Sequence, residues 1–299
     1  MESGPLLDRV RDRLRTPPSC GVPAADRLVA DALVPGKLLR PDLVVRSAAA
    51  AVATGGAALS PEAAERIVAG ALAVELLHVA TLVHDDIIDA APTRRGRLSV
   101  VAAAGTGTAI VVGDLLLARA AVAAAASSPL ASAACARALE RMAAGQLREA
   151  GLAAAPSVQA HAEYATLKTA ELFRTCAEVG AAAVGADPAV LEAHGRFGLH
   201  FGVAFQHVDD LLDAVGDPVL MGKPVGADAA NGVPTAVTLL DGSVEAVAGL
   251  VADELDAARE AVPALADWAT AGLRRALGTA LDLDGRRRTA GLAAALRTG

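Results

Sequence analysis

Long apolar runs, interrupted by short clusters of proline and glycine, make up most of this chain. Between residues 67 and 83 nearly every position is apolar, so a helix there has no polar face and should be buried on all sides. Ser60-Pro61-Glu62 marks its start, because serine is a good N-cap, proline suits the first turn and glutamate complements the helix dipole. The pattern predicts a central helix from there to Ala90 or Ala91.

The second half of the chain repeats this arrangement. Asp187-Pro188 opens an apolar segment that continues to Gly216-Asp217-Pro218. Elsewhere helix-like segments alternate with breaks such as 16–23, 92–96 and 105–107, and we identify no convincing run of period two that would indicate a strand. We therefore predict an all-α fold, a single large helical bundle around a central cavity that spans residues 1–299.

Composition narrows the function classes. Apolar residues make up 54% of the chain and aromatic residues 2%, which favours helices over sheets. The net charge of −7 argues against a nucleic-acid surface. The N-terminus has no apolar signal segment, no run was judged long enough to span a membrane, and the three cysteines lack metal-ligand spacing. These features predict a cytoplasmic protein without a transmembrane segment.

Two acidic motifs of the form Asp-Asp-x-x-Asp carry the candidate chemistry. The first acidic motif, residues 85–89, contains Asp85, Asp86 and Asp89; the second, residues 209–213, contains Asp209, Asp210 and Asp213. Positions four apart share a helix face, so each motif sets two carboxylates side by side in apolar surroundings. Such pairs repel each other until a divalent cation binds between them, and Mg²⁺ is the natural ion because it pairs one or two carboxylates with substrate phosphates. We expect two helices that face each other across one cleft.

Basic residues flank both motifs. Arg94, Arg95 and Arg97 follow the first motif, Gly36-Lys37 and Arg40 precede it, and Gly222-Lys223-Pro224 follows the second. Each of these alone fits a solvated surface charge. As a set they indicate a diphosphate site, because arginine forks bind phosphate oxygens in pairs.

The motifs resemble those of the trans-isoprenyl (polyprenyl) diphosphate synthases, roughly over residues 36–240. The resemblance rests on the run from Glu75 through His78 and the first motif to Arg94-Arg95-Gly96, on Phe205-Gln206 before the second motif, and on Gly222-Lys223-Pro224. It implies an isoprenoid synthase type I fold, a homodimer, and a transferase that joins isopentenyl diphosphate head-to-tail to an allylic diphosphate. The physiological product would be an all-trans polyprenyl diphosphate.

The resemblance also implies roles for individual residues. Asp85, Asp89 and Asp209 would be the main ligands of three Mg²⁺ ions, with Asp86, Asp210 and Asp213 in support. The residues for the allylic diphosphate would be Arg94, Lys168, Thr169, Gln206 and Lys223, and those for isopentenyl diphosphate would be Lys37, Arg40, His78 and Arg95. The chain departs from the family where Pro35 precedes Gly36, and where Val233 replaces a common lysine.

Product length is expected to depend on the residues one and two turns before Asp85. Thr81 and Leu77 share its helix face and Ala80 is the neighbour. In the family a bulky aromatic residue four or five positions before the first aspartate stops growth early. The small Ala80 and Thr81 resemble the medium- and long-chain branch, which predicts a C30 to C50 product, with geranylgeranyl or farnesyl diphosphate as the alternative. Phe201 either packs in the core or plugs the tunnel.

Two other functions share part of this pattern. A class I terpene synthase would ionise an allylic diphosphate but needs no isopentenyl site and carries many aromatic residues in its cavity. A non-catalytic subunit of a heteromeric synthase would not require both acidic motifs to be intact. The intact motifs and the few aromatic residues favour chain extension.

Overall fold

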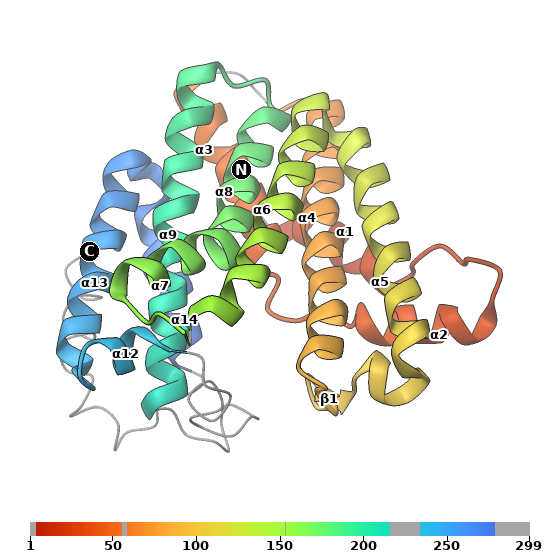
Figure 1. The fold of residues 1–299 in the computed structure, drawn as a ribbon. Coiled ribbons are helices and arrows are strands. Elements are labelled where there is room, and N and C mark those ends of the chain that lie inside the picture. The colour runs from red at the N-terminus through yellow and green to blue at the C-terminus, as the bar shows by residue number, and fades with distance from the viewer. Residues whose placement is uncertain (1–3, 56–58, 153, 216–233, 279–299) are drawn as a thin grey trace. The chain divides into compact units, whose positions relative to one another are not determined.

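The computed structural model describes residues 4–55, 59–152, 154–215 and 234–278. These residues are almost wholly helical (Figure 1), which confirms the predicted all-α class. The helices are α1 (Gly4–Arg15), α2 (Pro23–Ala32), α3 (Leu39–Gly55), α4 (Pro61–Ile88), α5 (Val100–Ser127), α6 (Pro129–Leu152), α7 (Val158–Ala165), α8 (Glu171–Ala183), α9 (Pro188–Val215), α12 (Ala236–Leu239), α13 (Val244–Ala261) and α14 (Ala266–Gly278). A π-helical turn, η1 (Thr166–Ala170), joins α7 to α8, and a 3₁₀ turn, η2 (Pro263–Leu265), precedes α14.

The chain divides into two compact units. Unit 1 comprises residues 1–137 and 175–191, and unit 2 comprises residues 138–174 and 192–299. Unit 1 contains the first acidic motif and unit 2 the second. The expectation that the two motifs face each other across a cleft, and the assignment of all residues to a single domain, stay predictions.

The central helix of unit 1 begins where the sequence predicts it and ends at Ile88, two residues before the predicted Ala90. The Ser60 side chain accepts a hydrogen bond from the Ala63 amide at 3.2 Å, and α4 then runs to Ile88, with Asp89 as its C-cap. Residues such as Ile67, Val68 and Val74 are fully buried, and α4 packs against α1, α3 and α5. Its apolar sequence is therefore the core of unit 1, and its C-terminal end carries the first acidic motif.

A short hairpin follows α4, where we predicted no strand. Strands β1 (Thr93–Arg94) and β2 (Arg97–Leu98) pair antiparallel around a two-residue turn. Both turn residues, Arg95 (φ +52°) and Gly96 (φ +75°), have left-handed backbone conformations, as the type I′ turn of a tight hairpin requires. Arginine is an unusual residue for this conformation, so a tight hairpin is hard to predict from these residues.

Two helices of unit 1 are long and apolar enough to cross a membrane by length and composition. In α4, 72% of the most apolar window is buried inside the protein, whereas in α5 only 39% is buried. This differs from our prediction, in which no run is long enough to span a membrane. The burial of α4 identifies it as a core helix, while α5 retains exposed apolar side chains.

In unit 2 an aromatic cluster forms the core. Phe201 of α9 lies at ring-centroid distances of 5.1 Å from Phe173 and 4.8 Å from Trp268. Close packing of α9 against η1 requires Gly202, because a Cβ there would lie 2.4 Å from the Ala170 Cα. Because of this close packing, the part of α9 that precedes the second acidic motif lies beside η1.

Candidate functional site

The first acidic motif separates its three carboxylates. Asp85 is partly exposed and Asp89 is exposed at the end of α4, whereas Asp86 is 1% exposed. The Arg94 side chain donates to Asp86 Oδ1 through Nε at 2.9 Å and also through Nη2. Asp86 therefore ties the hairpin to α4, while Asp85 and Asp89 share the other face, one turn apart.

A cationic cluster forms beside the motif within unit 1. Arg40 Nη1 lies 3.2 Å from His78 Nε2, and the Arg95 guanidinium lies against Gly36, where a Cβ would be 3.2 Å from the Arg95 Cζ. Burial and the charges of Arg40 and Arg95 hold the pKa of His78 well below its usual range, so His78 is neutral and accepts the Arg40 hydrogen bond. Arg95 also donates to the Val34 carbonyl at 3.1 Å.

These contacts bring together most of the predicted isopentenyl site. Arg40, His78 and Arg95 come from α3, α4 and the hairpin, and Lys37 lies exposed on the loop before α3. The buried carboxyl of Glu75 is also nearby; burial raises its pKa, and the charges of Arg40 and Arg95 act in the opposite direction. Positive groups gathered around a neutral histidine attract an anionic ligand, because guanidinium groups donate to its oxygens in pairs.

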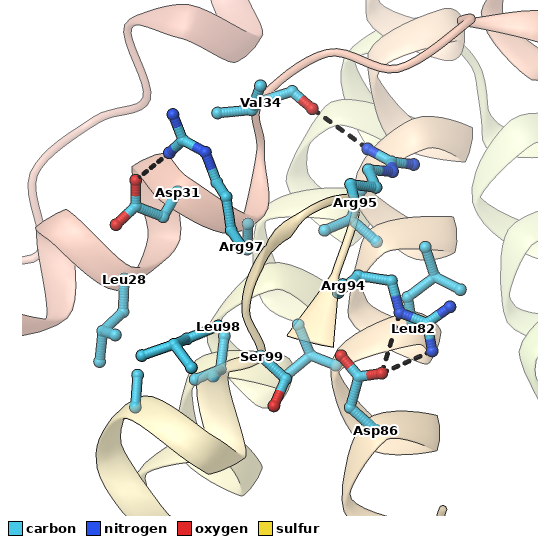
Figure 2. Close-up of a pocket in the computed structure, with 15 residues that line it drawn as sticks. Leu28, Asp31, Val34, Leu82, Asp86, Arg94, Arg95, Arg97, Leu98 and Ser99 are labelled. Atoms are coloured by element: carbon cyan, nitrogen blue, oxygen red, sulfur yellow. Dashed lines mark hydrogen bonds and ion pairs between the residues drawn. The ribbon is translucent and has the colours of Figure 1, made fainter. Parts of the chain in front are cut away.

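A cavity of about 420 Å³ lies behind the hairpin in unit 1. Figure 2 shows that Arg94, Arg95 and Arg97 reach it from the hairpin, each bound to its own partner: Asp86, the Val34 carbonyl and Asp31. Apolar residues of α2, α4 and α5, including Leu28, Leu82 and Val100, form much of the remaining wall. The cavity is thus lined by apolar residues and by three arginines of the hairpin.

The second acidic motif also turns its middle carboxylate to a separate face, but here the outer acid Asp213 is buried as well. Asp210 is 2% exposed and points to α7 and α12, whereas Asp209 and Asp213 share another face of α9. Burial alone would raise the pKa of Asp210, but hydrogen bonds from His161, the Ala236 amide and Gln206 hold the pKa below its usual range. Asp210 is therefore a buried, ionised anchor.

Residues of η1 lie next to the second motif in unit 2. Thr169 Oγ1 donates to Gln206 Oε1 at 2.6 Å, so the structure brings together two residues that the sequence assigned to the same diphosphate. Lys168 Nζ donates to Glu149 at 2.7 Å and lies 5.3 Å from the centre of the Tyr164 ring. Lys168 thus has its own counter-ion, and hydrogen bonds from Lys168 and Tyr164 hold the pKa of Glu149 below its usual range although burial opposes this.

The donors in both motifs fit Mg²⁺. Each motif offers a pair of carboxylates one turn apart, which are the hard oxygen ligands that Mg²⁺ prefers. Within the described residues, Asp213 Oδ1 is buried without a hydrogen-bond partner, a costly state for a carboxylate that no cation binds. Asp85, Asp89 and Asp209 are partly or fully exposed and remain the predicted ligands.

The predicted chain-length residues lie on two different units. In unit 1, Leu77 and Ala80 are buried, while Thr81 is partly exposed and donates from Oγ1 to the His78 carbonyl at 2.8 Å. In unit 2, Phe201 is fully buried in the aromatic cluster, as the core interpretation predicts. The predicted residues Lys223 and Val233 lie outside the described residues.

Sequence reasoning missed three polar residues in unit 2: Glu149, His161 and Tyr164. Each contacts a predicted site residue, because Glu149 and Tyr164 adjoin Lys168 and His161 binds Asp210. Glu149 and Tyr164 sit among ordinary helical positions, and His161 follows the N-cap Ser157 within a short helix, so their spacing carries no motif. Only the fold brings them to the site.

Relatives of known identity agree on one family. A sequence profile described as Polyprenyl synthetase matches residues 24–247. The chain is 36% identical, over 84% of its length, to geranylgeranyl diphosphate synthase of Mycobacterium tuberculosis and spans 73% of that protein. It is 34% identical, over 71% of its length, to nonaprenyl diphosphate synthase of the same organism and spans 63% of that protein. Against the mouse all trans-polyprenyl-diphosphate synthase PDSS1 it is 35% identical and spans half of the relative's length.

Solved structures agree with the sequence relatives. The structure resembles polyprenyl synthase from Caulobacter crescentus CB15, complexed with calcium and isoprenyl diphosphate, with a TM-score of 0.70 and 29% identity over 99% of this chain and 94% of that one. It resembles geranylgeranyl pyrophosphate synthase from Lactobacillus brevis with a TM-score of 0.71 and 28% identity over 98% and 96% of the two chains. These neighbours have the isoprenoid synthase type I fold that the resemblance implied. On the match over residues 24–247, and with prenyl diphosphate synthases among its relatives, the chain belongs to the polyprenyl synthetase family of transferases.

Proposed function

We propose that this protein joins isopentenyl diphosphate head-to-tail to an allylic diphosphate and releases diphosphate. The observation that carries the proposal is the cationic cluster of Arg40 and Arg95 around the neutral His78. A terpene synthase needs only one diphosphate site, next to its acidic motifs. A second cluster of arginines supports a second diphosphate substrate, and hence chain extension.

Two sets of residues bind the two diphosphate substrates. Arg40, Arg95 and Lys37 hold isopentenyl diphosphate, and His78 stays uncharged so that it can accept the Arg40 hydrogen bond and fix the guanidinium. Lys168, Thr169 and Gln206 hold the allylic diphosphate together with Arg94 and Lys223. Apolar side chains of α4, such as Leu77 and Ala80, keep water from the allylic cation once the C–O bond has broken.

Asp85, Asp89 and Asp209 hold the magnesium ions. When bound, Mg²⁺ neutralises charge on the departing diphosphate and so favours ionisation. The number of ions, which the resemblance puts at three, is part of the proposal. The calcium in the Caulobacter structure supports a divalent cation in this family.

Incubation with Mg²⁺, radiolabelled isopentenyl diphosphate and allylic starters of C5, C10, C15 and C20 tests the activity. We expect a labelled product longer than the starter, and none when Mg²⁺ is removed by a chelator. Cyclised hydrocarbon without incorporated label would instead identify a terpene synthase. Failure to extend any starter would instead indicate a subunit of a heteromeric synthase. Component 2 of a heptaprenyl diphosphate synthase represents this class among the relatives.

We propose a C30 to C50 product, because Thr81 and Ala80 are small at the positions one turn before Asp85. The relatives make products of several lengths, from farnesyl to decaprenyl diphosphate. The alternative is a short product such as geranylgeranyl or farnesyl diphosphate, and product analysis distinguishes the two. On this proposal, the prenyl tail grows past Thr81, whose side chain is partly exposed.

Thr81→Phe is expected to shorten the product, because the larger ring fills the path of the tail. The matched control is Leu72→Phe, which places the same ring on the opposite face of α4, since nine residues turn a helix by about 900°. Chromatography of the dephosphorylated products measures their length. Unchanged products in Thr81→Phe, at unchanged activity, would contradict the assigned path.

We also propose a homodimer that forms through α5. Val111, Leu115, Ala118 and Val122 follow a 4-3-4 spacing and lie on one face, where Val111 is 65% and Val122 is 72% exposed. Spacing of this kind suits side-by-side packing against a second copy of the same helix. Exposed valines in such a stripe are costly in water and are covered when two copies associate.

Val111→Glu combined with Val122→Glu is expected to convert the dimer to a monomer, because the dimer would then bury four added carboxylates without partners. Light scattering after size-exclusion chromatography measures the mass. Val158→Glu serves as the control, since Val158 is 45% exposed at the start of α7 and glutamate suits that position. A wild-type monomer, or a double variant that stays dimeric, would rule out this interface.

A further inference from the structure

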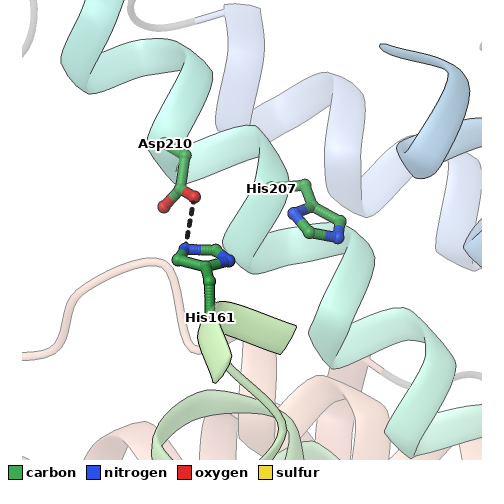
Figure 3. A group of neighbouring side chains, drawn as sticks. All are labelled: His161, His207 and Asp210. Atoms are coloured by element: carbon green, nitrogen blue, oxygen red, sulfur yellow. Dashed lines mark ion pairs between the residues drawn. The ribbon is translucent and has the colours of Figure 1, made fainter. Parts of the chain in front are cut away.

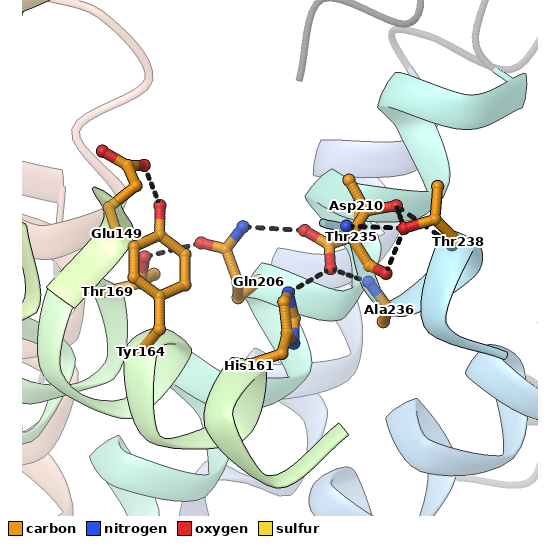
Figure 4. Close-up of polar contacts among 9 residues, drawn as sticks. All are labelled: Glu149, His161, Tyr164, Thr169, Gln206, Asp210, Thr235, Ala236 and Thr238. Carbon is orange, nitrogen blue, oxygen red and sulfur yellow. Dashed lines mark hydrogen bonds and ion pairs between the residues drawn. The ribbon is translucent and has the colours of Figure 1, made fainter. Parts of the chain in front are cut away.

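A chain of hydrogen bonds links the second acidic motif to α7 and α12 inside unit 2 (Figure 4). Gln206 Nε2 donates to Asp210 Oδ1 at 2.9 Å, and the Ala236 amide donates to Asp210 Oδ2 at 2.8 Å. His161 Nε2 lies 2.9 Å from the same Oδ2. Asp210 thus contacts three donors from three segments, and His161 supplies the contact from α7.

The direction of these bonds follows from their partners. The Thr169 hydroxyl donates to Gln206 Oε1, which turns the Gln206 amide nitrogen towards Asp210. The ionised Asp210 can only accept, so His161 carries its proton on Nε2. Loss of the His161 donor leaves Asp210 Oδ2 less well paired, so the carboxylate can rotate and weaken the hydrogen bond that Oδ1 accepts from Gln206.

We propose that His161 is a positioning residue, which holds Asp210 and through it fixes Gln206 for the allylic diphosphate. The inference rests on the proposed function, because Gln206 is assigned to that substrate by resemblance. His161 is buried, with 2% of its surface exposed. It lies on α7, whereas the second acidic motif lies on α9, so it acts through its contact with Asp210. It also steadies the backbone that carries Asp209 and Asp213, the neighbouring acids of the motif.

A second buried histidine, His207, provides a control that separates the hydrogen bond of His161 to Asp210 from the packing of its ring. His207 stacks on His161 with ring centroids 6.0 Å apart, and Figure 3 shows it beside the His161–Asp210 pair. Its Nδ1 is buried without a hydrogen-bond partner in the described part of the chain. His207 therefore shares the surroundings of His161, and no bond from it to Asp210 is seen among these residues.

The arrangement also resembles a cation site, because ligand atoms of His161, His207 and Asp210 lie within 4.8 Å of one another. Hydrogen bonding accounts for it better. Asp210 Oδ2 already accepts two N–H groups at normal distances, which occupy the lone pairs that a metal would need.

The test compares His161→Phe, His161→Gln and His207→Leu. His161→Phe keeps a ring but loses the donor, and we expect the KM for the allylic diphosphate to rise about tenfold, which corresponds to about 1.4 kcal/mol. The KM for isopentenyl diphosphate should stay near the wild-type value. His161→Gln restores an N–H near the position of Nε2 and should recover most of the loss, while His207→Leu should leave both KM values close to wild type. Thermal unfolding of each variant confirms that assays are run well below its midpoint.

The outcomes are distinct. Equal losses in His161→Phe and His207→Leu, or failure of His161→Gln to recover, would reduce His161 to a packing residue and overturn the inference. Stoichiometric zinc in the purified protein that His207→Leu abolishes would replace it with a metal site. An inactive wild-type protein would instead refute the proposed function, and this is seen before any variant is compared.

Discussion

Replacing Asp85 by asparagine is expected to lower kcat/KM for chain extension by about a thousandfold. The substitution keeps the size of the side chain but removes the charge that binds Mg²⁺, and metal binding contributes several kcal/mol to the ionisation step. Asp85 is partly exposed on the outward face of α4, so its loss should change the unfolding midpoint little. The Mg²⁺ concentration that gives half-maximal rate should rise as well.

Glu62→Gln is the matched control for Asp85→Asn. It removes one carboxylate from the same helix, at the exposed first turn rather than the last. We expect full activity and a small loss of stability, because Glu62 favours the positive end of the helix dipole. Steady-state rates over a range of Mg²⁺ concentrations measure both variants. Near-normal activity of Asp85→Asn at low Mg²⁺ would show that the first acidic motif does not bind the metal.

Phe201→Ala is expected to lower the free energy of unfolding by about 3 to 5 kcal/mol while leaving the product length unchanged. Phe201 is fully buried and packs edge-on against Phe173 and next to Trp268, so truncation leaves a cavity in the core of unit 2. Denaturation in urea, followed by the fluorescence of Trp268, the only tryptophan in the chain, measures the loss.

Phe205→Ala is the comparison for Phe201→Ala. Phe205 lies one turn further along α9 and contacts the same cluster, but it is partly exposed. Its truncation should therefore lower the free energy of unfolding by less than that of Phe201. Product analysis of both variants separates the two roles considered for Phe201. Longer products from Phe201→Ala, with little loss of stability, would identify a plug in the path of the tail rather than a core residue.

The sequence predicted best the elements whose ends are marked by local chemistry. Ser60 and Pro61 mark the start of α4, and Gly105, at a predicted break, interrupts α5 with φ +80°. The hairpin was missed because its strands are two residues long and its turn places an arginine at positive φ. Such a conformation is imposed by the surrounding contacts, including those of Arg94 and Arg95, and leaves no periodic pattern to detect.

The structure places together several residues that the motifs link, and their role in the site stays a prediction. Residues that only the fold brings to the candidate site had no signal in the sequence. Arg40, His78 and Arg95 were assigned to one ligand, and the structure joins them; Thr169 and Gln206 likewise form a hydrogen bond. His161 was missed because a lone histidine in a short helix carries no spacing signal. Its significance depends on the position of Asp210, which lies on a different helix.

The middle acids of the two motifs, Asp86 and Asp210, change how the repeated motif should be compared among proteins. Each is held by donors from neighbouring segments, whereas the two outer acids of its motif share another face of the helix. The motif therefore carries two separate selective constraints. Substitutions at the outer acids are constrained by the chemistry of the substrate. Substitutions at the middle acid are constrained by the residues that donate to it, which are Arg94 for Asp86 and His161 for Asp210.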